Sequence, residues 1–244
     1  MQPCERGSGT VLDEVRGFLV RQKLFGVVMP PSVSEDDRVV AILKEADCPY
    51  VRIASVSLDE PGCMVVTHDS RGAARAARHL AELGHRRIAF ISGPDTFRSS
   101  HERGRGFAEG LAEHGLVLDP AYIRRAAYTF ESGVEAATEL LALPQRPTAI
   151  FAGNDEMAIG VMKAARDAGL DVPRDLSIVG FDDLPMASRV WPNLTTVRLP
   201  IRDMGRMAAE KLTAGLRGLD PATLAQPEVD PSLVVRDSTA APRH

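Results

Sequence analysis

Four polar side chains follow closely after two apolar runs of the chain: Asn154, Asp155, Asp182 and Asp183. The runs, at 148–152 and 176–181, have the length and composition of buried strands. Asn and Asp side chains hydrogen-bond hydroxyl groups, and one carboxylate can accept from two of them at once. These hydrogen-bonding groups suit a site that binds a polyol or a sugar. The alternative is structural, because the same residue types cap helices and shape turns.

The segment between the two runs predicts how these side chains are positioned. Apolar residues within 157–168 recur at helical spacing, and Gly169 then ends the helix as a C-terminal cap. Two strands joined by a helix are parallel, and parallel α/β sheets bind ligands at the carboxyl ends of their strands. We therefore expect all four polar side chains to face one crevice, which favours a site over two unrelated turns.

The rest of the chain alternates between helix and strand. Helical spacing of apolar residues occurs at 11–23, 36–46, 71–83, 103–114, 132–143 and 201–215. Short apolar runs predict strands at 24–29, 49–55, 63–66, 85–92, 126–128 and 232–236. This alternation predicts an α/β protein with parallel sheets flanked by helices. The extended stretch at 191–200 breaks the alternation and indicates a crossing between two lobes.

The composition indicates a soluble protein with two domains. Its 244 residues exceed the usual size of one domain, and 44% of them are hydrophobic, enough to bury full cores. With a formal net charge of -4, the chain has no overall excess of basic residues of the kind that favours nucleic-acid binding. No apolar segment reaches membrane-spanning length and no signal sequence follows Met1, so we expect a cytoplasmic protein without membrane contact.

Motifs for catalysis, cofactors and metals are absent from the sequence. It has no GxGxxG after a strand, no P-loop, no nucleophile elbow and no Ser/His pair at motif spacing. Cys4, Cys48 and Cys63 show neither CxxC nor Cys/His ligand spacing, so free thiols are expected and no metal. Asp182 and Asp183 are neighbours on a turn and point apart, which does not suit an acid/base pair. The sequence predicts a binding protein without cofactor and not an enzyme.

Seven blocks, read in order, resemble the lactose/galactose repressor (LacI/GalR) family of bacterial transcription regulators. They are HDSRGAARAARHLAELGHRRIAFISGP, SSHERGRGF, ESGVEAATELL, PTAIFAGNDEMAIG, VPRDLSIVGFDDLP, PNLTTVRLPIRDMG and LVVRDST. The resemblance runs from about residue 11 to residue 239. One block alone is a weak signal, but seven in the family's order are specific.

The resemblance implies a two-lobed fold similar to periplasmic sugar-binding proteins, with a small molecule in the cleft between the lobes. It places the crossovers near Leu80, Leu199 and Val229. The amino-terminal lobe then comprises 1–79 plus about 200–228, and the carboxyl-terminal lobe 80–199 plus about 229–240. The family's DNA-binding headpiece, its hinge helix and the first βαβ unit of the amino-terminal lobe are not in this sequence. We therefore expect an effector-binding core with an incomplete first lobe.

The resemblance also implies which residues bind the effector. Arg103, in RGRG, matches a cleft arginine whose guanidinium can fork across vicinal hydroxyls or pair with a carboxylate. Asn154 and Asp182 match effector-contacting positions, whereas Asp155 and Asp183 are expected to brace their turns. Tyr128 matches a position that often carries an aromatic ring against the ligand. The structural alternatives are a solvated Arg103 and a scaffold Tyr128.

Three further residues are candidates for contacts with the effector. Ser99 and His101 are expected in a loop just before the helix that carries Arg103. Trp191 is the single tryptophan, and it is expected either to line the cleft or to wedge the crossover between the lobes.

The function expected from these residues and the resemblance is that of a homodimeric core of a transcriptional regulator. It would bind a small sugar or sugar-like metabolite and control operator binding through a headpiece not present here. The alternative is a stand-alone solute-binding module that does not bind DNA. Two helices are candidates for the dimer surface, at 71–83 and at 204–216, and the sequence does not choose between them.

Overall fold

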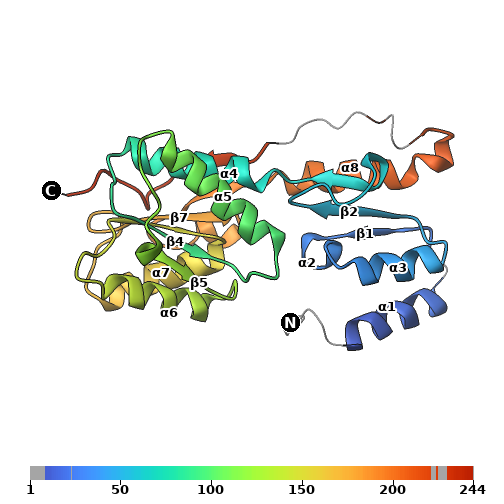
Figure 1. The fold of residues 1–244 in the computed structure, drawn as a ribbon, viewed down its shortest axis with the longest axis horizontal. Helices are drawn as coiled ribbons and strands as arrows, with labels where there is room; N and C mark the ends of the chain where they lie inside the picture. Colours follow the sequence, from blue (N-terminus) through green and yellow to red (C-terminus); the bar gives the residue numbers. More distant parts are fainter. Residues whose placement is uncertain (1–8, 23, 221–223, 225–229, 244) are drawn as a thin grey trace. The chain divides into compact units, whose positions relative to one another are not determined.

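The computed structural model describes residues 9–22, 24–220, 224 and 230–243 (Figure 1). The chain divides into two compact units, of which unit 1 comprises Met1–Thr67 and Pro200–Val229, and unit 2 comprises His68–Leu199 and Asp230–His244. The chain thus passes from one unit to the other at three points. The first lies between Thr67 and His68, whereas the resemblance placed it near Leu80. The helix that begins at Asp69 packs on unit 2, and for this reason its residues belong there.

Unit 1 contains a three-stranded parallel sheet in the order β1-β2-β3. Its strands are β1 (Val27–Met29), β2 (Tyr50–Ala54) and β3 (Met64–Val66), and its helices are α1 (Gly9–Arg21), α2 (Pro31–Ser34), α3 (Asp37–Glu45), α8 (Ile201–Thr213) and the short η1 (Pro61–Cys63) and η4 (Gly215–Arg217). Every residue of β2 is buried, as a central strand requires. Figure 1 shows α8 on one face of this sheet and α3 on the other.

Unit 2 contains a six-stranded sheet in the order β5-β4-β6-β7-β8-β9. Its strands are β4 (Ile88–Ser92), β5 (Ile123–Arg125), β6 (Ala149–Ala152), β7 (Ser177–Asp182), β8 (Thr195–Arg198) and β9 (Ser232–Val234), and its helices are α4 (Asp69–Glu82), α5 (Arg98–Ala112), α6 (Phe130–Leu141), α7 (Asp155–Asp167) and the short η2 (Pro120–Tyr122) and η3 (Pro185–Ser188). All neighbours are parallel except β9, which pairs antiparallel with β8. The α/β class with parallel-dominated sheets is confirmed.

Helices cover both faces of the unit 2 sheet, and each face has its own core. Figure 1 shows α4 and α5 on one face and α6 and α7 on the other. The α5 face contains an aromatic stack in which the rings of Phe107 and Phe151 lie 4.6 Å apart, centroid to centroid. Gly106 and Gly110 let α5 approach α4 closely, since a Cβ on Gly106 would lie 2.0 Å from the carbonyl oxygen of Ser70. This close packing fixes the position of α5 over the sheet.

Two sequence predictions near Tyr128 and Arg103 are corrected by the structure. The strand expected at 126–128 lies at Ile123–Arg125, so Tyr128 is not at a strand end. Tyr128 instead has a left-handed backbone with a φ of 62°. The helix expected from Arg103 already begins at Arg98, directly after Phe97, whose ring packs edge-on against Tyr128. The stretch 191–200 is extended where it forms β8 of the unit 2 sheet, and the chain passes to unit 1 at its end, between Leu199 and Pro200, where a crossing was predicted.

Candidate functional site

Arg103 and Asp182 meet at the carboxyl ends of β6 and β7. Arg103 lies on α5, and its Nη2 is 3.5 Å from Oδ1 of Asp182, the last residue of β7. Its Nη1 donates to the carbonyl oxygen of Gly153, directly after β6. The guanidinium carbon lies 3.8 Å from the ring centroid of Phe181, a cation–π distance. Arg103 is therefore buried at the edge of the sheet and is not the solvated arginine of the alternative interpretation.

Asp69 is the nearest carboxylate partner of Arg103. Nε of Arg103 donates to Oδ2 of Asp69 at 2.7 Å, and both side chains are buried. Asp69 is the first residue of α4, and His68 before it has a left-handed backbone with a φ of 52°. The motifs of the sequence do not single out Asp69 as a site residue. No local pattern reveals this pair, because it joins two helices that are separate along the chain.

Burial and neighbouring charges shift the pKa of both Arg103 and Asp182 in this cluster. Burial disfavours a charged Arg103, but the carboxylates of Asp69 and Asp182 outweigh it and raise the pKa of the guanidinium. Burial raises the pKa of Asp182 to about 7; the charge of Arg103 opposes this rise, and the charges of Asp155 and Asp69 add to it. The side chain of Asp182 is 24% exposed and that of Arg103 is 9% exposed. Asp182 thus presents the accessible carboxylate of the cluster.

Asn154 caps α7. Its Oδ1 accepts from the backbone N–H of Met157 at 2.9 Å, and its Nδ2 donates to the carbonyl oxygen of Tyr128 at 3.1 Å. Both functional groups of this buried amide are thus already engaged within the protein. The cap suggested as the structural alternative is present, and it ties the start of α7 to the loop that carries Tyr128.

Tyr128 stands beside Arg103. Its hydroxyl is 2.8 Å from Oγ of Ser100, and its ring centroid is 5.9 Å from the guanidinium carbon of Arg103. The ring lies directly over Gly93, where a Cβ would come within 2.1 Å of it. A glycine after β4 therefore allows this ring to lie against the strand ends.

The remaining residues predicted to contact the effector are Ser99, His101 and Trp191. Ser99 and His101 lie on the first turn of α5 rather than in a loop, and it is Ser100 that contacts Tyr128. His101 is exposed, and its Nε2 is 2.9 Å from the carbonyl oxygen of Asp95. Trp191 is 89% exposed. The structure does not bring His101 or Trp191 into the Arg103 cluster.

Asp155 and Asp183 both brace the turn after β7, which is the predicted role for Asp183, whereas Asp155 was expected to brace its own turn after β6. Asp155 accepts from the Thr196 hydroxyl at 2.5 Å and from the backbone N–H of Leu184 at 2.7 Å, and burial raises its pKa to about 6. Asp183 pairs with two arginines, including Arg236 at 2.5 Å. Asp182 and Asp183 both have positive φ values, 113° and 55°. Such strained backbone persists where its surroundings over-determine it, often at functional sites.

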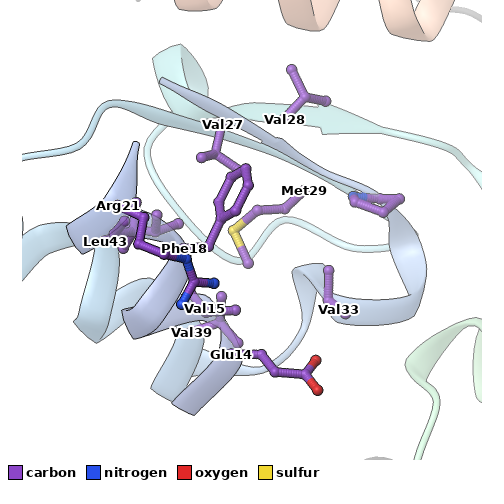
Figure 2. A pocket seen from close by; sticks show the side chains of 12 residues that line it. Glu14, Val15, Phe18, Arg21, Val27, Val28, Met29, Val33, Val39 and Leu43 are labelled. Carbon is purple, nitrogen blue, oxygen red and sulfur yellow. The ribbon is translucent and has the colours of Figure 1, made fainter. Parts of the chain in front are cut away.

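One large pocket of the structure belongs to unit 1, between α1, α3 and β1 (Figure 2), whereas the Arg103 cluster belongs to unit 2. Its volume is about 500 Å³, and Figure 2 shows Phe18, Val27 and Met29 lining it. Among its described lining residues, Glu14 and Arg21 are the charged ones. This apolar lining does not suit a ligand rich in hydroxyl groups.

Within 9–22, 24–220, 224 and 230–243, no group of three or more His, Cys, Asp or Glu side chains is arranged to hold a metal ion. In the same part of the chain, none of the helices combines the length and the apolar character needed to span a bilayer.

Comparisons with known proteins match this architecture. Residues 77–239 match the periplasmic binding protein-like domain. A LacI family transcriptional regulator from Mycobacterium smegmatis superposes with a TM-score of 0.82 at 32% identity, covering 97% of this chain and 86% of that one. The transcriptional regulator CelR in complex with cellobiose gives a TM-score of 0.83 at 32% identity, over 95% of this chain and 71% of that one.

Similar sequences are regulators. The probable HTH-type transcriptional repressor ExuR of Bacillus subtilis is 33% identical over 93% of this chain and 68% of its own length. Catabolite control protein A of Priestia megaterium is 38% identical over 77% of this chain and 56% of its own length. ExuR, CelR and the M. smegmatis protein are named as transcriptional repressors or regulators and not as enzymes, in agreement with the missing catalytic motifs. The chain belongs to the LacI family of transcription regulators and contains its periplasmic binding protein-like core.

Proposed function

We propose that this chain is the effector-binding core of a transcriptional regulator and that a small sugar or sugar-like metabolite binds at the carboxyl edge of the unit 2 sheet. One observation carries the proposal: the buried Arg103 guanidinium is held by Asp69 and lies beside the partly exposed carboxylate of Asp182. Strand ends of this kind are the usual ligand position in parallel α/β sheets.

The chemistry of the cluster matches a polyol. An ionised Asp182 can accept hydrogen bonds from two adjacent hydroxyl groups. Nη2 of Arg103 makes only a long contact of 3.5 Å with Asp182, so this nitrogen retains donor capacity for a sugar oxygen. The ring of Tyr128, 5.9 Å from the guanidinium carbon, offers an apolar face to the C–H side of a pyranose.

Structures of related proteins support a sugar as the effector class. The CelR structure contains cellobiose. A LacI family regulator from Enterococcus faecium, 25% identical to this chain with a TM-score of 0.80, contains ribose. Each of these two structures superposes on 95% of this chain.

Effector binding then controls DNA binding by shifting a conformational equilibrium. A ligand that binds one arrangement of the core better than another favours that arrangement by its difference in affinity. In this proposal the core acts as a homodimer, and operator DNA is bound by a headpiece outside these residues.

Ligand-induced thermal stabilisation tests the proposal, with cellobiose and ribose as the first probes. A ligand present at a hundredfold excess over its Kd is expected to raise the Tm by about 5–10 °C. Arg103→Ala and Asp182→Asn should abolish this rise, each measured against its own ligand-free Tm. Arg105→Ala is the matched control, because Arg105 is exposed on the same helix and pairs with Glu102 and Glu109. If both site variants keep the rise, the site is not at this cluster.

A further inference from the structure

A second pocket lies in unit 1, between the starts of β2 and β3 and the helix α8. Its volume is about 520 Å³, within the range of small-molecule sites. Most of the lining is apolar, and its side chains include Phe25, Tyr50, Cys63, Leu212, Lys44 and Lys211. All of these residues belong to unit 1, whereas the Arg103 cluster belongs to unit 2.

Lys211 is a buried cation with little compensation. It is 3% exposed, and among the described residues its ammonium group has one hydrogen-bond acceptor, the carbonyl oxygen of Pro61 at 2.9 Å. An ammonium group has three N–H donors, and a buried charge is costly unless it is paired. Burial lowers the pKa of Lys211, and a negative charge on Cys63 opposes this effect. No carboxylate of the described residues lies within ion-pair distance of it.

A second lysine, Lys44, also lines the pocket. The Nζ of Lys44 lies 5.9 Å from the ring centroid of Tyr50. Among the described lining residues, Lys44, Lys211 and the exposed Asp47 carry charge, so the cations exceed the anions by one. Asp59 accepts from the Tyr50 hydroxyl and lies 3.8 Å from Nη1 of Arg52. The charges of Asp59 and Glu60 also act on Cys63, where they oppose those of Lys44 and Lys211.

We propose that this pocket is a second ligand site, which binds a small carboxylic acid with an apolar body. The carboxylate pairs with the ammonium group of Lys211 and satisfies its remaining donors. The apolar body packs between the side chains of Phe25 and Leu212. A monoanion fits better than a phosphate ester, since one buried ammonium and a mainly apolar lining cannot satisfy a dianion with three acceptor oxygens.

The experiment compares octanoate with octan-1-ol, which shares the apolar chain but has no charge. Cys63 lines the pocket and is partly exposed, so a bound ligand shields its thiol from iodoacetamide. The alkylation rate of Cys63 is read by peptide mass spectrometry. Octanoate at ten times its Kd is expected to slow the reaction about tenfold, and octan-1-ol at the same concentration much less. Equal protection by the two compounds, or none by either, overturns the proposal.

Variants of Lys211 locate the carboxylate. Lys211→Met should lose the protection by octanoate and leave any protection by octan-1-ol unchanged, whereas Lys211→Arg should retain most of it. Lys163→Met is the matched control, because Lys163 is an exposed lysine on α7 of unit 2. Protection by octanoate that is the same in Lys211→Met as in the wild type contradicts the assignment. If Lys211→Met does not fold, the comparison of octanoate with octan-1-ol on the wild type still decides.

Discussion

Nε of Arg103 lies 2.7 Å from Oδ2 of Asp69, 34 residues earlier in the chain, and both side chains are buried. The pair joins α5 to the first residue of α4. It orients the guanidinium so that Nη1 reaches the carbonyl oxygen of Gly153 and Nη2 approaches Asp182. Asp69 is thus the residue that positions Arg103 at the sheet edge.

Replacing Asp69 by asparagine should destabilise unit 2. The substitution leaves the buried Arg103 charge without its nearest partner, and breaking a buried ion pair costs about 3–5 kcal/mol. Urea unfolding followed by circular dichroism measures the change. Glu113→Gln is the control, because Arg78 and Glu113 form an exposed pair between the same two helices. A loss in Asp69→Asn no larger than that in Glu113→Gln would show that Asp69 does not stabilise Arg103.

The stability of the protein should depend on pH through Asp182. Its pKa is raised from the ordinary value of 3.8 to about 7, so the folded state holds this proton more tightly than the unfolded state does. The stabilisation from this proton is complete below pH 3.8 and is lost as pH rises towards 7. Asp182→Asn should therefore gain stability relative to the wild type between pH 4 and pH 7, in unfolding free energies measured at several pH values. Asp167→Asn, on the exposed end of α7, is the control, and a gain that is independent of pH would contradict the assignment.

Adding a methyl group at Gly106 should displace α5. A Cβ there would lie 2.0 Å from the backbone oxygen of Ser70, which cannot move as a side chain can. Overpacking of this kind costs about 1–3 kcal/mol. Gly106→Ala should also weaken ligand-induced stabilisation, since Arg103 lies one turn away on the same helix. Gly205→Ala on α8 meets no atom within 4 Å and should instead stabilise the helix by about 0.5–1 kcal/mol.

Two substitutions separate the hydroxyl of Tyr128 from its ring. Tyr128→Phe removes the 2.8 Å contact with Ser100 and should cost about 0.5–1.5 kcal/mol while leaving the sugar response in place. Tyr128→Leu removes the aromatic face and should reduce the ligand-induced rise in Tm. Calorimetry of both variants with the same sugar makes the comparison. A response that is equally strong in Tyr128→Leu would show that the ring does not contact the ligand.

Most of the secondary structure could be predicted from the sequence, because its signals are local. The apolar periodicity identifies α4, α6 and α7 to within two residues at each end. Gly84, Gly115 and Gly169 have positive φ values where helices were predicted to end. The parallel pairing of β6 with β7 follows from the helix between them, and it brings the polar residues after both strands to one edge of the sheet. These relationships involve neighbouring segments, so the sequence alone determines them.

The tertiary structure decided which of these polar residues belong together. Asn154 caps α7 and Asp155 braces the neighbouring turn, while Asp182 remains partly exposed, although all three follow strands in the same way. The pairing of Asp69 with Arg103 depends on the close packing of α4 on α5 that Gly106 permits. The burial of Lys211 likewise depends on how α8 packs against η1. Contacts between segments distant in the chain leave no periodic signal in it, and packing alone determines them.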